Sequence, residues 1–179
     1  NMLFFWSNHV LVAQERPLDL LNQNAAMLIF IDESGWFVVP SNGGWSVCCV
    51  GALVVPEDSY LEIVSEFEKL KTGWGVVGRE VKGRDLGETE IASVVATLKR
   101  FDVLLEIVVI DMGLQTIAGI EAHKAWQVQR IMENITSAYK RELIDSLKKL
   151  QSRIAALPDQ LYTQATLMTV LVQKLLQNM

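Results

Sequence analysis

Short apolar runs alternate with longer amphipathic segments along the chain. The first run, 27–31, is rich in branched and aromatic residues and stops at Asp32, so it predicts a buried strand rather than a helix. Two more runs flank a cluster of Pro, Ser, Asn and Gly residues and predict a hairpin, and a fourth run ends at Asp111. The predicted strands cover residues 27–31, 36–39, 45–55 and 103–110.

Between and after these runs, apolar residues recur at helical spacing. Pro56, followed by two acidic residues and a serine, is a helix-start signal. Apolar residues surround the last segment almost completely, which suits a helix buried in the fold or against a partner. The predicted helices cover 57–71, a segment around 91–98, one long helix or a broken pair over 115–157, and 161–176 after Pro158. Together these elements predict an α/β fold with a long helical C-terminal part.

Length and composition narrow the possibilities. The chain has 179 residues, of which 50% are hydrophobic and 21% are charged, which favours one domain with a sizeable core. The longest purely apolar stretch, 47–55, is far shorter than the roughly 18 to 20 residues of a membrane-spanning helix. The apolar start at Leu3-Phe4-Phe5-Trp6 has no basic residue before it, so we expect a cytoplasmic protein. Residues 1–26 form an amide-rich N-terminal extension, and 27–179 form the predicted domain.

Charge and cysteine content exclude several common functions. A formal net charge of -5 argues against a general nucleic-acid-binding surface, so nucleic acid would need a local basic patch. The adjacent Cys48 and Cys49 are expected to be reduced core thiols that point to opposite faces of a strand. Neither zinc nor a Ser-His-Asp triad is indicated, because the two cysteines and two histidines are poorly spaced and there is no G-x-S-x-G motif.

The best chemical signal is carboxylates at strand ends. Asp32 and Asp111 each follow a predicted core strand, and Glu80 lies in the loop between them. If they converge at one edge of a sheet, their hard oxygen ligands suit Mg²⁺ or Mn²⁺. The structural alternative is that Asp32-Glu33-Ser34-Gly35 is a polar turn and that Asp111 is a helix N-cap.

Two further patterns lie near Glu80. A set of basic residues predicts a local basic lip beside the acidic site, or simply a solvated surface. The residues of this set are Lys69, Lys71, Arg79, Lys82 and Arg84. Residues 73–78 match the spacing G-x-G-x-x-G, but a dinucleotide site needs this loop after a strand and before a helix, whereas here it follows a predicted helix.

The order of the motifs resembles a known family. The motifs are Ile31-Asp32-Glu33-Ser34-Gly35, Val54-Val55-Pro56-Glu57, Glu80-Val81-Lys82-Gly83 and a strand ending at Asp111. In this order they resemble a bacterial and phage domain-of-unknown-function family with an N-terminal Asp-Glu motif and a ribonuclease H-like fold. The resemblance covers residues 27–176 and implies a mixed sheet of about five strands flanked by helices.

The resemblance also implies a site. Asp32, Glu33, Glu80 and Asp111 would lie near the active centre, with Lys82 as a phosphate or structural partner. The chain departs from the family pattern in one respect: a late Gln-x-x-Asp motif is missing, since no Asp or Glu follows Asp159. Either the sequence ends before the last strand of the domain, or it is a degenerate member that cannot complete a two-metal site.

Two functions follow from these expectations. The first is a Mg²⁺- or Mn²⁺-dependent nuclease or phosphodiesterase in which Asp32 and Asp111 hold the metal and Glu80 is a third ligand or general base. The second is a non-catalytic interaction module of the same fold that dimerises or binds a partner through its apolar C-terminal helices. A third possibility is nucleotide binding at the 73–78 loop.

Overall fold

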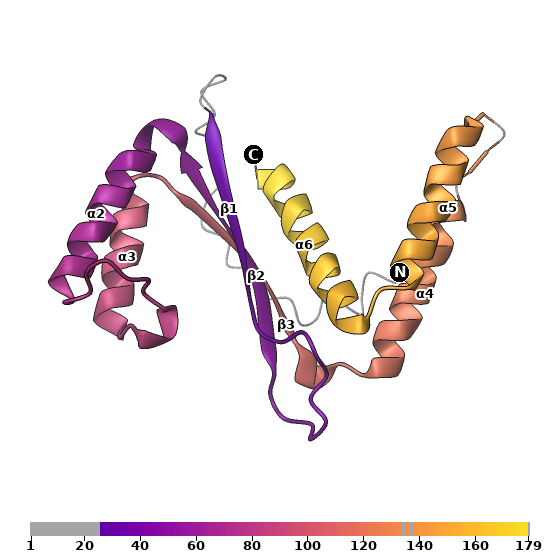
Figure 1. The fold of residues 1–179 in the computed structure, drawn as a ribbon, viewed down its shortest axis with the longest axis horizontal. Coiled ribbons are helices and arrows are strands. Elements are labelled where there is room, and N and C mark those ends of the chain that lie inside the picture. Colours follow the sequence, from indigo (N-terminus) through magenta and orange to yellow (C-terminus); the bar gives the residue numbers. More distant parts are fainter. Residues whose placement is uncertain (1–25, 134, 137, 179) are drawn as a thin grey trace. The chain divides into compact units, whose positions relative to one another are not determined.

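The computed structural model describes residues 26–133, 135–136 and 138–178 (Figure 1). Residues 1–25 of the predicted N-terminal extension lie outside this range. The described part confirms the α/β class. Its elements in chain order are β1 (Met27–Ser34), β2 (Val47–Pro56), η1 (Glu57–Ser59), α2 (Tyr60–Gly73), η2 (Gly83–Asp85), α3 (Glu88–Arg100), β3 (Leu104–Asp111), η3 (Met112–Leu114), α4 (Ile117–Glu133), α5 (Arg141–Ala155) and α6 (Asp159–Asn178).

The strands form one antiparallel sheet in the order β1-β2-β3. The N–H of Glu57 donates to the carbonyl of Ala26 (3.0 Å), so the end of β2 lies beside the start of β1. The N–H of Met112 donates to the carbonyl of Ser46 (2.7 Å), so the start of β2 lies beside the end of β3. The described residues thus contain three antiparallel strands, where the family resemblance implied a mixed sheet of about five.

β2 is the central strand and shows the clearest alternation. Cys48, Val50, Ala52 and Val54 are at most 1% exposed, whereas Cys49 between the first two is only half-buried. The prediction that the two cysteines point to opposite faces is confirmed, because successive side chains of an extended strand alternate.

Two strand predictions need correction. Residues 36–39 are not a strand, because Gly35 (φ 109°) and Phe37 (φ 53°) have backbone conformations that an extended strand excludes. β1 is a strand but not a buried one: Ile29, Phe30 and Ile31 are 46%, 46% and 42% exposed. Only β2 flanks it among the described elements, so this apolar strand is an edge of the sheet.

The chain separates into two compact units, and each strand has residues in both. Among the described residues, one unit contains 26–32, 51–106 and 178, and within it α2 and α3 lie side by side (Figure 1). The Glu66 carboxylate joins the two helices, because it accepts hydrogen bonds from Lys69 (2.6 Å) and from Arg100 of α3 (3.0 Å). These bonds lower the pKa of Glu66 below its usual value.

The other unit contains, of the described residues, 33–50, 107–133, 135–136 and 138–177. α4 and α5 lie side by side in it (Figure 1), with Gln151 donating to the carbonyl of Val128 (3.1 Å), so the broken pair is the correct form of the predicted 115–157 segment. α6 turns only one face into the core, and Leu161, Val172 and Leu176 on the rest of the helix are 49%, 41% and 72% exposed, so the prediction of a helix buried almost all round is only partly correct. Its buried residues are Tyr162, Thr163, Leu167, Leu171 and Leu175. In the part of the chain that is described, no helix is both long and apolar enough to cross a bilayer.

Candidate functional site

Asp32 and Glu33 lie exposed near the end of β1. The strand must turn directly after them, because Gly35 adopts a φ of 109° and lies against β2. A Cβ at Gly35 would approach the Cys48 Sγ to 2.6 Å, so only glycine fits there. The two carboxylates therefore stand in solvent on the open edge strand itself, because β1 continues through Ser34. The polar-turn alternative for Asp32-Glu33-Ser34-Gly35 is therefore wrong for its first three residues, and the chain turns only at Gly35.

Asp111 has a structural role at the end of β3. Its Oδ1 accepts a hydrogen bond from the N–H of Gly113 (2.8 Å) and a longer one from the N–H of Ser46 (3.4 Å). It therefore caps η3 and ties the end of β3 to the start of β2, which confirms the N-cap alternative for this residue. One carboxylate oxygen is thereby committed to backbone donors.

Glu80 lies in the loop between α2 and η2, where it pairs with Lys82. The Lys82 Nζ is 2.5 Å from the Glu80 Oε1, and the two side chains are 53% and 72% exposed. An exposed pair of this kind contributes only about 0–1 kcal/mol to stability. Glu80 and Lys82, the two charged residues of the Glu80-Val81-Lys82-Gly83 motif, are therefore paired with each other.

The predicted metal ligands are not assembled in the described residues. No group of three or more His, Cys, Asp or Glu side chains within 26–133, 135–136 and 138–178 is arranged to hold a metal ion. The set Asp32, Glu80 and Asp111 therefore stays a prediction. No family model, curated protein or solved structure matches the chain, so the resemblance to the Asp-Glu family also stays an expectation.

The predicted basic lip is largely neutralised by local ion pairs. Lys69 pairs with Glu66, Lys71 with Glu68 (2.8 Å), Lys82 with Glu80, and Arg84 with Asp85 (3.9 Å). Since each of these cations has an acidic neighbour close in sequence, the positive potential available to a phosphate backbone is small.

The 73–78 loop ends a helix and does not open one. The N–H of Gly75 donates to the carbonyl of Thr72 (3.0 Å), and that of Val76 donates to the carbonyl of Lys71 (2.8 Å). This pair of bonds is a Schellman motif, in which Gly75 supplies the left-handed residue (φ 73°). The glycine spacing thus has a structural explanation without a dinucleotide.

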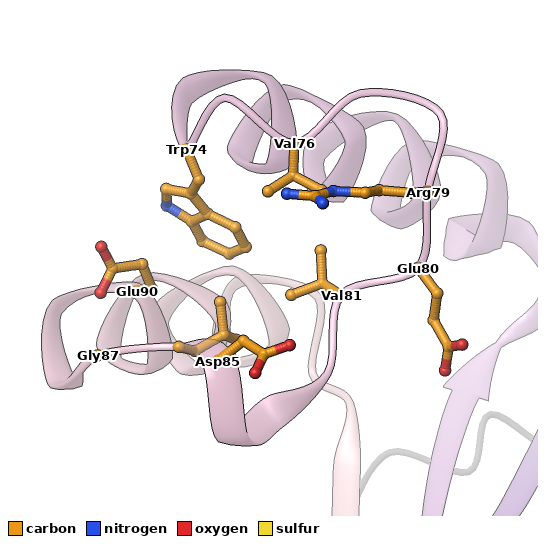
Figure 2. Close-up of a pocket in the computed structure, with 9 residues that line it drawn as sticks. Trp74, Val76, Arg79, Glu80, Val81, Asp85, Gly87 and Glu90 are labelled. Carbon is orange, nitrogen blue, oxygen red and sulfur yellow. The ribbon is translucent and has the colours of Figure 1, made fainter.

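A pocket of about 330 Å³ opens between the end of α2 and the start of α3 (Figure 2). Figure 2 shows the Trp74 ring and the Val81 side chain directed into it, with Arg79 extending across it toward Val76. Glu80 lines the pocket, but its carboxylate points away from the indole. The lining residues are Trp74, Val76, Arg79, Glu80, Val81, Asp85, Leu86, Gly87 and Glu90. Glu80 and Arg79 are the only members of this pocket that the sequence patterns had singled out as charged site residues.

Glu106 was missed from the sequence. It lies on the buried face of β3 with 0% exposure, and its Oε2 accepts a hydrogen bond from the Asn178 Nδ2 (3.1 Å). Its Oε1 has no hydrogen-bond partner among the described atoms. An unsatisfied buried polar atom costs on the order of 1–3 kcal/mol. Its position inside the apolar run 103–110 is the feature of the sequence that could have predicted a buried glutamate.

His123 and Tyr162 form a hydrogen-bonded pair between α4 and α6. The Tyr162 hydroxyl and the His123 Nδ1 are 2.7 Å apart, and the Trp126 ring lies beside the imidazole. Burial lowers the pKa of His123 and raises that of Tyr162. Next to them, the Lys124 Nζ donates to the Asp159 carboxylate (2.6 Å) and to the carbonyl of Leu157 (3.0 Å). This cluster holds the start of α6 against α4.

Proposed function

We propose that the chain is a protein-interaction domain that self-associates by pairing β1 with β1 of a second copy. The observation that carries this proposal is the exposure of an apolar edge strand. Ile29 and Ile31 project from one face and Phe30 from the other, and each is more than 40% exposed. Phe30 has partial cover, since its ring stacks on Tyr60 with 5.7 Å between the centroids.

The backbone of β1 supports the same proposal. The carbonyl of Ala26 points to β2, where it accepts from Glu57, and in an antiparallel strand alternate residues point the same way. The N–H and C=O groups of Met27, Ile29 and Ile31 therefore face the open edge. Natural edge strands are commonly protected by lysine, proline or a bulge, and residues 27–31 contain neither lysine nor proline.

The charge pattern of β1 favours an antiparallel pair of copies. With Ile29 opposite Ile29 of the second copy, Met27 faces Ile31 and Asp32 faces Ala26. The two acidic ends then lie at opposite ends of the ribbon. A parallel pair in register would place Asp32 beside Asp32, and like charges directly opposite are destabilising.

Sedimentation velocity over a range of concentrations tests this function. We expect the wild-type chain to sediment with twice the monomer mass, and Ile29→Lys and Ile31→Lys to shift it to monomer. Ile29→Lys places two ammonium groups opposite each other at the two-fold axis, and Ile31→Lys places one opposite Met27 of each partner strand. Leu61→Lys is the matched control: it makes the same change on α2 at a side chain that is 77% exposed, and it should leave the dimer intact. A wild-type chain that is monomeric at every concentration contradicts the proposal, and a dimer that survives both edge variants assigns the contact to another surface, such as the C-terminal helices.

A second candidate is the divalent-metal-dependent nuclease or phosphodiesterase with a ribonuclease H-like fold. It is favoured by the exposure of Asp32 and Glu33, which make no ion pair with any described side chain and are accessible to a cation. The commitment of the Asp111 Oδ1 to backbone donors weakens this candidate, because that oxygen is less available to a metal ion.

Calorimetric titration of Mn²⁺ tests the metal site directly. We expect saturable binding if the candidate holds, with loss of binding in Asp32→Asn, because the amide removes the negative charge that attracts the ion. Glu62→Gln, an exposed acid on α2, is the control and should bind as the wild type does. Absence of binding to the wild-type chain, or equal binding to Asp32→Asn, removes the candidate.

A further inference from the structure

The turn that leads from β1 toward β2 carries an exposed Asn-Gly pair. Asn42 and Gly43 are both exposed, and Gly43 adopts a left-handed φ of 64°. A Cβ placed on Gly43 would have no heavy atom within 4 Å, so nothing crowds the chain at this point. Loop tips of this kind open readily, and water reaches both residues.

The Asn42 side chain folds back over the backbone that follows it. The N–H of Gly44 donates to the Asn42 Oδ1 (3.2 Å). The ring that this hydrogen bond closes contains both the Asn42 Cγ and the Gly43 nitrogen, so it keeps the amide carbon close to that nitrogen. The bond also polarises the side-chain carbonyl, which makes its carbon a better electrophile.

The Gly43 nitrogen itself is weakly held. Its N–H donates to the carbonyl of Pro40 at 3.3 Å, which is longer than the usual range of about 2.7–3.2 Å. This turn bond must break before the nitrogen can attack, and in an exposed turn the opening costs little because water replaces the lost partner. Since glycine has no side chain, the nitrogen is also unhindered.

We propose that Asn42 is a site of spontaneous deamidation. The Gly43 nitrogen gives up its proton to water and bonds to the Asn42 Cγ, and the Cγ–Nδ2 bond breaks as ammonia leaves. Water then opens the cyclic imide. Cleavage between Cγ and the Gly43 nitrogen yields aspartate, and cleavage between the Asn42 main-chain carbonyl carbon and that nitrogen yields isoaspartate. The net reaction consumes water, releases ammonia and turns an amide into a carboxylate, with no change of oxidation state.

The modification alters a segment that is uncharged and closely packed. Residues 34–56 contain no Asp, Glu, Lys or Arg, so the new carboxylate is the first charge in this stretch. Isoaspartate also adds a methylene to the main chain just before Gly44, whose carbonyl oxygen is 2.5 Å from the position of a Cβ on Gly113. Because this contact leaves no room for a longer backbone, the isoaspartate form should loosen the hydrogen bond from the Met112 N–H to the Ser46 carbonyl (2.7 Å).

Mass spectrometry of the folded chain, incubated at neutral pH and body temperature, tests the proposal. We expect the peptide that contains Asn42 to gain about 1 Da with time, as –NH2 is replaced by –OH. The gain should be faster at about pH 8 than at about pH 6, because the attacking nitrogen must lose its proton. A transient species that lacks the mass of one ammonia identifies the imide, and chromatography separates the two final products, which have equal mass.

Gly43→Ala is the matched variant. Its methyl group crowds the attacking nitrogen and should slow the conversion roughly tenfold, which corresponds to a barrier higher by about 1.4 kcal/mol. Equal rates in the wild type and Gly43→Ala would overturn the proposal, because water would then hydrolyse the amide directly. An unchanged mass in the folded chain, under conditions in which a synthetic peptide of residues 38–46 converts, would overturn it as well.

Hydrogen exchange tests the effect on the fold. The Met112 N–H should exchange faster in the separated isoaspartate form than in the unmodified chain, because its bond to the Ser46 carbonyl is loosened. Asn42→Asp is the control, since it adds the charge without the extra methylene and should exchange as the wild type does. Exchange that is equally slow in the isoaspartate form would overturn this consequence for the fold.

Discussion

At the scale of single residues, α2 and α3 end in the same backbone motif with different residues at its critical position. In both, a left-handed residue donates to a carbonyl three residues back and the next residue donates to one five residues back. In α2 the left-handed residue is Gly75 (φ 73°), and in α3 it is Asp102 (φ 52°). The α3 bonds run from Asp102 to Lys99 (3.4 Å) and from Val103 to Leu98 (3.2 Å).

This comparison predicts opposite effects for two substitutions. Asp102→Gly should raise the free energy of unfolding by about 1 kcal/mol, because glycine adopts this conformation without the Cβ clash and because a negative charge leaves a helix C-terminus. Gly75→Asp should lower it by about 1 kcal/mol for the converse reason. Urea denaturation measures both. Asp102→Asn is the control that removes the charge alone, and an Asp102→Gly protein no more stable than Asp102→Asn would show that the backbone conformation is not strained.

At the scale of elements, the spacing of hydrophobic residues predicted those features of a strand or helix that depend on its own local sequence. The alternation of β2 reflects which side of the strand meets the core, and a sequence records that directly. The spacing of hydrophobic residues does not specify the order of the strands in the sheet. β1 has the composition of a central strand but lies at the edge, so its burial was predicted wrongly.

The same limit applies to the candidate site. The Asp111 cap joins Asp111 to Gly113, and the ion pair joins Glu80 to Lys82. Both contacts link residues two apart in sequence, so they can be predicted from the local sequence alone. The pocket beside Trp74 and the burial of Glu106 depend on how separate elements meet, which no spacing rule states. The predicted strand over 36–39 failed for a different reason: two positive φ angles at Gly35 and Phe37 override the strand propensity of its aromatic and branched residues.

At the scale of the whole molecule, the His123–Tyr162 pair makes stability depend on pH in both directions. Burial holds the pKa of His123 below 6.5 in the folded chain, so the unfolded chain binds more protons as the pH falls. Its contribution is therefore complete above pH 6.5 and is lost as the pH falls below that value. The raised pKa of Tyr162 acts at the other end: its contribution is complete below pH 10.0 and is lost as the pH rises above it.

We therefore expect the melting temperature to fall as the pH is lowered from 7.5 to about 5, across the ordinary histidine range, and His123→Gln to show a smaller fall. The glutamine amide keeps a hydrogen-bond acceptor for the Tyr162 hydroxyl but does not titrate. The neighbouring Lys124–Asp159 pair is unchanged in both proteins, so the difference between their pH profiles isolates the imidazole. Tyr162→Phe should likewise reduce the loss of stability above pH 10.0. Parallel profiles for the wild type and His123→Gln would mean that acid destabilisation comes from carboxylates elsewhere in the chain and that the imidazole contributes nothing to it.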